Sequence, residues 1–127
     1  MKLYTLGTSH GAAEIGRMCS GNLLEVNGAY YLFDCGGCVE GKMTNMELPI
    51  SKIRAVFITH MHEDHAGSLS AIAKRFLAYM NKEKSVELYL PEQNGIVSFQ
   101  NWMRALHLEP DESLVSFFFS AGRGVLS

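Results

Sequence analysis

Apolar and polar positions alternate in short runs at the start of the chain, and this pattern predicts strands. Such runs occupy residues 3–6, 23–26 and 29–33. The second and third runs are joined by Asn27-Gly28, a dipeptide that favours the positive φ values of a tight hairpin turn. The chain is therefore expected to open as an antiparallel sheet.

Beyond residue 38 the pattern changes to helical stretches that alternate with single strands. Helices are expected at 39–48 and 68–82, and strands at 53–58, 85–90 and 114–119. Helix 68–82 carries one apolar stripe, formed by Leu69, Ile72, Ala73, Phe76, Leu77 and Met80. The off-stripe cations Lys74, Arg75, Lys82 and Lys84 predict a solvated face. In the helix at 39–48, the methionines and the leucine are expected to face inward.

Prolines punctuate this second part of the chain. Pro49 is expected to stop the first helix, and Pro91 to open the last, where its missing N–H costs nothing. The apolar residues of that last helix are interpreted as core, namely Ile96, Val97, Phe99, Trp102, Met103 and Leu106. The order of elements predicts an α/β fold, a mixed sheet with helices on one face.

Between strand 53–58 and helix 68–82 lies a dense cluster of side chains that bind metals: His60, His62, Asp64 and His65. In an extended segment His60 and His62 point the same way, so both can reach one metal, while Met61 points elsewhere. If the chain then turns into the helix, Asp64 and His65 can reach a second metal nearby. Imidazole and carboxylate together suit zinc, manganese or iron. The alternative is a polar turn with solvated histidines.

This cluster resembles the His-x-His-x-Asp-His signature of the metallo-β-lactamase superfamily. Three further segments resemble the opening of its ribonuclease Z-like phosphodiesterase branch, namely 6–11, 17–22 and 32–36. The resemblance covers about the first two-thirds of the chain. It implies an αββα fold of which this chain, a single domain over 1–127, supplies the N-terminal αβ half.

The resemblance also implies a function and its residues. The function is phosphodiester hydrolysis by a water that the metals activate, with two Zn²⁺ per complete site and Mn²⁺ or Fe²⁺ as alternatives. Asp64 would both ligate metal and orient the nucleophile, and Asp34 would support the metal loop without being a ligand. The family takes a third histidine, a bridging aspartate and a final histidine from its later half. This chain offers only His10, His107, Asp34 and Asp111 besides the cluster.

Composition and charge limit the kinds of molecule that the chain is expected to bind. The 127 residues carry a net charge of −2, with acids and bases interspersed, so there is no basic nucleic-acid footprint. A phosphodiester or other small anionic substrate would be held locally, and the small residues of loop 8–11 could approach a phosphate or form an ordinary turn.

No stretch approaches the length of a membrane span, and the odd number of cysteines, three, predicts reduced thiols in a cytoplasmic protein. Cys35-x-x-Cys38 is interpreted as small, partly buried residues beside a glycine turn, with a zinc knuckle as the alternative.

Three hypotheses for the function stay open. In the first, the chain is a metal-dependent phosphodiesterase; RNA ends, cyclic nucleotides and thioesters share the same metal core in the family. In the second, it is a truncated, inactive half-domain that binds metal weakly or not at all. In the third, it is a regulatory or binding module that keeps the fold without turnover. The apolar run 117–119 predicts a sheet face that must be covered, so the chain is expected either to self-associate through that face or to be a truncated form of a longer gene.

Overall fold

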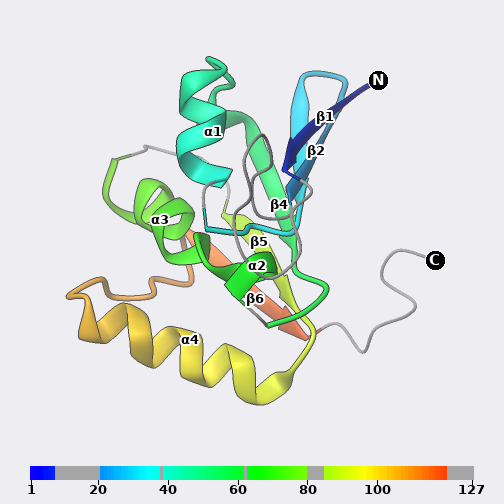
Figure 1. Cartoon of the computed structure of the whole chain (residues 1–127). Coiled ribbons are helices and arrows are strands. Elements are labelled where there is room, and N and C mark those ends of the chain that lie inside the picture. Colours follow the sequence, from blue (N-terminus) through cyan, green and yellow to red (C-terminus); the bar gives the residue numbers. More distant parts are fainter. Residues whose placement is uncertain (8–20, 38, 62, 80–84, 120–127) are drawn as a thin grey trace.

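The computed structural model describes residues 1–7, 21–37, 39–61, 63–79 and 85–119. These residues form a six-stranded sheet in the order β1-β2-β3-β4-β5-β6 (Figure 1). Neighbouring strands run antiparallel from β1 to β3 and parallel from β3 to β6. The strands are β1 (Lys2–Gly7), β2 (Gly21–Val26), β3 (Ala29–Phe33), β4 (Ile53–Phe57), β5 (Val86–Leu90) and β6 (Val115–Phe119).

The hairpin between β2 and β3 forms where the sequence predicts it. Asn27 has a φ of 51° and Gly28 a φ of 80°, and the flanking residues Val26 and Ala29 are paired. Positive φ at both central residues gives the turn a twist that matches the twist of the strands. The antiparallel opening of the chain is therefore confirmed.

Helices fill the connections between the parallel strands. They are α1 (Val39–Asn45), α2 (Glu63–Ala66), α3 (Leu69–Lys74) and α4 (Gln93–Ala105), with the 3₁₀ turn η1 (Ile50–Lys52) and the π-helical turn η2 (Arg75–Tyr79). Each parallel connection advances one strand in the same direction, so right-handed crossovers put α1, α3 and α4 on one face (Figure 1). A mixed sheet with helices on one face is confirmed. None of the helices within the described ranges is long and apolar enough to span a bilayer.

The core lies between these helices and the sheet, on what we call the covered face. It is mostly aliphatic, and its strand residues alternate with those of the opposite face. From the sheet come Leu23, Leu32, Val56, Val86, Leu88, Leu90 and Val115, and from the helices Val39, Met43, Leu69, Ile72, Phe76, Phe99 and Met103.

The opposite side of the sheet, the open face, carries a row of four stacked aromatic rings. Phe33 stacks on Phe57 at 5.1 Å between centroids, Phe57 on Tyr89 at 4.8 Å, and Tyr89 on Phe118 at 5.0 Å. The row follows the strand register, in which these four residues pair across β3, β4, β5 and β6. We call it the aromatic row. Phe118 at its end is 40% exposed.

Helix α1 ends earlier, and for a different reason, than expected. It stops at Asn45, and Glu47 then adopts a φ of 57° while the Leu48 N–H donates to the Met43 carbonyl at 2.9 Å. This left-handed termination satisfies the last carbonyls before Pro49 is reached. The prediction that Pro49 stops the helix was therefore wrong, and so was the inward placement of Met46, which is 40% exposed.

Helix α4 also differs from its prediction. It begins at Gln93, with Glu92 at the N-cap, so Pro91 lies before the helix. Gly95, Phe99 and Met103 make its buried stripe. The helix contacts the sheet along this one stripe, which leaves three residues predicted as core exposed: Val97, Trp102 and Leu106, at 55%, 55% and 41%.

The long helix predicted over 68–82 is instead two pieces within the described residues, α3 and η2. The turn α2 precedes it, α3 ends at Lys74, and the chain widens into η2 from Arg75; residues 80–84 lie outside the described part. Arg75 is not simply solvated, because its guanidinium contacts Glu40 of α1 at 2.9 Å.

Candidate metal centre

The histidine segment leaves the carboxyl end of β4, in the middle of the parallel strands. The Ile58 N–H donates to the Tyr89 carbonyl, which prolongs the pairing with β5 by one residue. Thr59 and His60 follow, and α2 then brings His65 back toward the sheet. Ligands collect at this edge in open α/β sheets, outside the carboxyl ends of the strands.

Two of the four predicted ligands can be placed. His60 and His65 are described, and their rings lie 4.7 Å apart between centroids at an angle of 47°. His62 lies outside the described residues, as does the side chain of Asp64, whose backbone belongs to α2. The prediction of the full ligand set stays a prediction.

Asp34 is the buried centre of this edge. It follows β3 directly, is 7% exposed and adopts a φ of 64°. Aspartate is one of the few residues other than glycine that reach this left-handed region. Its N–H donates to the Phe57 carbonyl at 2.7 Å, so the bend at Asp34 is fixed against β4.

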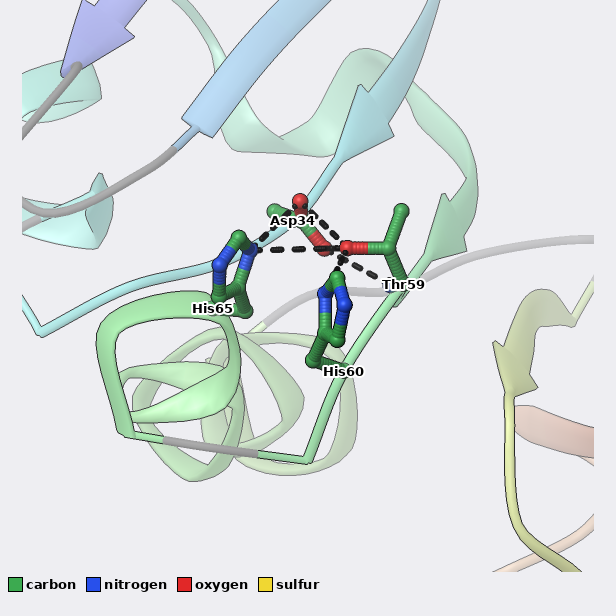
Figure 2. A network of polar contacts seen from close by, with 4 residues as sticks. All are labelled: Asp34, Thr59, His60 and His65. Atoms are coloured by element: carbon green, nitrogen blue, oxygen red, sulfur yellow. Dashed lines mark hydrogen bonds and ion pairs between the residues drawn. The ribbon is translucent and has the colours of Figure 1, made fainter. Parts of the chain in front are cut away.

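The Asp34 carboxylate accepts hydrogen bonds from Thr59 and His65 (Figure 2). The Thr59 N–H lies 2.7 Å from Oδ1, and the Thr59 hydroxyl lies 2.9 Å from both carboxylate oxygens. His65 Nδ1 lies 2.8 Å from Oδ2. Asp34 therefore makes the supporting contacts to the histidine segment that the family resemblance implied.

The Thr59 hydroxyl extends this network to the other histidine. Its Oγ1 lies 2.9 Å from His60 Nδ1 and 3.4 Å from His65 Nδ1 (Figure 2). The Thr59 hydroxyl thus contacts the Nδ1 atoms of both imidazoles, and the Asp34 carboxylate contacts that of His65. Sequence reasoning missed Thr59, although a hydroxyl residue at the end of the strand, directly before the cluster, was the available signal.

A second set of bonds ties α2 to the end of β3. The Cys35 N–H donates to the His65 carbonyl at 2.6 Å, and the Ser68 N–H donates to the Cys35 carbonyl at 3.0 Å. The Cys35 thiol contacts the Ser68 hydroxyl at 3.1 Å. Burial raises the pKa of the Cys35 thiol to about 12, so this group stays protonated near neutral pH. Cys35 is fully buried rather than partly buried, and Cys38 lies outside the described residues.

Met61 anchors the segment from the other side. As the alternation of side chains predicts, it does not join the histidines but packs against the core. Its side chain lies over Gly95 in the first turn of α4, where an added Cβ would meet Met61 Cε at 3.4 Å. Helix α4 therefore supports the backbone between His60 and residue 62.

Two of the other candidate ligands, His107 and Asp111, do not reach this edge. His107 and Asp111 line a surface pocket of about 520 Å³ together with Leu77, Leu108, Glu109 and Leu114. Leu114 precedes β6, and its carbonyl accepts from Val86 at the start of β5, so the pocket lies at the opposite, amino end of the parallel strands. His10 and loop 8–11 lie outside the described residues.

The donor chemistry at the edge fits a divalent cation. Histidines that ligate metals commonly hold a carboxylate or another oxygen through their second ring nitrogen, and His65 and His60 do so through Asp34 and Thr59. Among the residues whose side chains are described, no three His, Cys, Asp or Glu are grouped closely enough to hold a metal. A third ligand would have to come from residues such as His62 or Asp64.

Solved structures with this fold are metallo-β-lactamase fold proteins. The chain superposes on human tRNase Z, short form, with a TM-score of 0.76 and 24% identity, over 92% of this chain and 43% of that one. It superposes on the metallo-β-lactamase fold protein YhfI from Bacillus subtilis with a TM-score of 0.72 and 18% identity, over 93% and 45% of the two chains. The predicted fold class is confirmed.

Sequence relatives are ribonucleases Z. The chain is 34% identical over 106 residues to ribonuclease Z of Pseudomonas putida (strain GB-1), which covers 82% of this chain and 31% of the enzyme. It is 32% identical over 92 residues to ribonuclease Z of Methanocaldococcus jannaschii, 72% of this chain and 29% of that enzyme. The chain thus spans about a third of the length of the curated relatives it matches.

Fold and relatives together define the class, a metallo-β-lactamase fold with ribonuclease Z homologues, as the histidine signature implied. Within that class, one family model matches most of the chain. The model of the family described as anti-Pycsar protein Apyc1 matches residues 1–113, and the chain belongs to this family.

Proposed function

We propose that the chain carries the first half of the active site of a metal-dependent hydrolase that cleaves small phosphodiesters. The ribonuclease Z relatives support phosphodiester chemistry. The observation that carries the proposal is the contact of Asp34 and Thr59 with the Nδ1 atoms of His65 and His60. A network of this kind orients imidazoles for a metal at their other nitrogen.

We assign the metal contacts to the four residues of the signature. His60 and His62 would hold one cation, and Asp64 and His65 a second, with Zn²⁺ as the first choice and Mn²⁺ or Fe²⁺ as alternatives. When bound, such cations make water more acidic and stabilise negative charge on a phosphoryl oxygen. Asp64 would also orient the nucleophilic water, while Asp34 stays outside the ligand set.

Charge favours a small substrate over a long nucleic acid. The net charge is −2, so no extended basic surface is available to bind an anion. The proposed site would bind the anion through the metals and a few groups at the edge of the sheet. A protein that binds a long backbone neutralises many phosphates with lysine and arginine. We therefore propose a phosphodiester with few phosphates as the substrate.

The test compares metal content and hydrolysis in matched variants. Bis-p-nitrophenyl phosphate, a cyclic mononucleotide and a short RNA are offered with Zn²⁺ or Mn²⁺ added. We expect His60→Ala to abolish turnover and to lower the bound metal per chain. His107→Ala, at the opposite end of the sheet, is the control and should leave both unchanged. A rate that survives His60→Ala unchanged would contradict the proposal.

A second candidate is a segment that does not turn over substrate on its own. His107 and Asp111 lie at the far end of the strands, so neither supplies a third ligand to the metals. With two protein ligands for each metal, chelation would be weak. Weak metal binding in His60-intact protein, with no hydrolysis of any of the three substrates, would favour this candidate over the enzyme.

We also propose two properties that depend on the surface and the thiols. In the isolated protein a second copy of the chain would cover the open face, because the aromatic row offers an apolar surface that includes exposed Phe118. A cytoplasmic location is proposed because the described thiol, Cys35, is free and buried.

A further inference from the structure

We infer that Thr59 is a positioning residue that selects the Nδ1–H tautomer of His60, as Asp34 does for His65. Each imidazole then keeps an unprotonated Nε2 for a divalent cation. The last step rests on the proposed metal site, whereas the choice of tautomer rests only on the contacts of Thr59, Asp34 and the two histidines.

The protons of this network can be counted. An ionised carboxylate only accepts, so Asp34 needs a proton on each group that bonds to it. At 2.8 Å from Oδ2, His65 Nδ1 must therefore carry its proton. The Thr59 hydroxyl has one proton, and its oxygen lies 2.9 Å from both oxygens of the same carboxylate.

The destination of the Thr59 proton decides the tautomer of His60. Bonds to a carboxylate are roughly twice as strong as bonds between neutral groups, so the hydroxyl donates to Asp34 rather than to an imidazole. Only lone pairs of Oγ1 then face His60 Nδ1, which lies 2.9 Å away. A bond across that distance requires the proton on Nδ1, and the unprotonated nitrogen of His60 is Nε2.

The longer contact of Thr59 is consistent with this count. Oγ1 lies 3.4 Å from His65 Nδ1, whose proton has a closer acceptor in Asp34 Oδ2. The backbone adds a further restraint, because the Thr59 N–H donates to Asp34 Oδ1 at 2.7 Å and places the hydroxyl beside the carboxylate. Replacing the hydroxyl would remove the oxygen that lies 2.9 Å from His60 Nδ1 while leaving this backbone bond in place.

The first experiment reads the tautomers without metal. Metal-free protein is labelled with ¹⁵N-histidine and examined by NMR about two pH units above the ordinary histidine pKa of about 6.5. We expect His60 to be protonated on Nδ1 in the native chain and in Thr59→Ser, and to shift toward the Nε2–H form in Thr59→Val. His107 should keep the same spectrum in all three proteins. A native His60 protonated on Nε2 would overturn the inference, even if Thr59→Val failed to fold.

The second experiment reads the consequence for metal binding. Competition with a chelator gives the Zn²⁺ affinity of the native chain, Thr59→Ser and Thr59→Val, with folding checked by circular dichroism. Removing a partner of a ligating histidine typically costs about 10- to 100-fold in affinity, and we expect that loss for Thr59→Val and recovery in Thr59→Ser. Equal affinities in Thr59→Val and the native chain would overturn the role of Thr59. If the native chain binds no Zn²⁺, the proposed function fails, and the tautomer spectra still decide the inference.

Discussion

The two faces of the sheet differ in kind. On the covered face, aliphatic side chains such as Leu32, Val56 and Leu88 are fully buried under the helices. On the open face, the aromatic row runs across four strands and ends at half-exposed Phe118. Residues of the same strand therefore alternate between two environments. One set is buried in the core under the helices, and the other lies on an apolar surface that the described residues do not cover.

The difference shows what each face does for the site. The rings of the row contact one another through their faces, so their edges make up its outer surface. Ring edges suit packing against another apolar surface, whereas the bases of a nucleic acid would stack on exposed ring faces. The covered face instead carries the helices that hold the histidine segment, through Ser68 before α3 and Gly95 of α4. Stability and site geometry are thus expected to depend on the covered face, and association on the open face.

The largest effect is expected from Leu88→Ala on the covered face. Leu88 has no exposed surface, and truncating a buried leucine costs about 2–5 kcal/mol in the free energy of unfolding. Tyr89→Ala, one residue away on the open face, is the matched comparison and should cost clearly less in urea unfolding. An equal cost that grows with protein concentration would mean that a second copy already covers the open face.

The next effect concerns association through the open face. If a second copy covers the aromatic row, Phe118→Ser should weaken the dimer at least about tenfold, since buried aromatic anchors commonly carry more than about 1.4 kcal/mol. Trp102→Ser is the control, because Trp102 is also exposed but lies on α4. Analytical ultracentrifugation measures both. A native chain that stays monomeric at micromolar concentration would remove the proposed second copy.

A smaller effect should appear at alkaline pH and trace to Cys35. Burial raises the pKa of this thiol from 9.0 to about 12, so above pH 9 the unfolded chain loses a proton that the folded chain keeps. Stability should therefore be complete below about pH 9 and fall as pH rises toward 12, by about 1 kcal/mol over the first pH unit. Urea unfolding of the native chain and Cys35→Ala at each pH isolates this contribution. Parallel pH profiles for the two proteins would show that the thiol ionises equally in both states.

The smallest effect is expected on the outer side of α4. Trp102 is 55% exposed, so Trp102→Ala should change the free energy of unfolding by no more than about 0.5 kcal/mol. Fluorescence quenching by acrylamide in the native chain should reach this sole tryptophan readily. A strongly protected indole would instead place α4 against another surface.

The local pattern predicted what depends on local chemistry. Asn27-Gly28 placed the hairpin, and the alternation of β-branched and aromatic residues placed β3, β4 and β5 within about one residue. The end of α1 was missed because it depends on Glu47, a left-handed residue at a position where the sequence offers no glycine. The buried side of α4 was missed because its apolar residues outnumber the single stripe that the sheet can cover.

The site was predictable to the same extent. The spacing of His60 and His65 identified the cluster, and the family resemblance supplied Asp34 as its support. The position of Thr59 before the cluster was a signal, but its partner Asp34 was not predictable from spacing, because their contact depends on β3 and β4 ending side by side, 25 residues apart in the sequence. Contacts of that kind follow from sheet register rather than from the order of residues.

The packing of Met61 on Gly95 has a consequence for how such chains diverge. A Cβ at position 95 would already be in van der Waals contact with Met61 Cε, so a side chain that extends further would compete with the methionine for this space. Substitutions at these two positions are therefore expected to be compensatory, with a gain in volume at one matched by a reduction at the other. Covariation between positions 61 and 95 would record this shared space in the family's sequences.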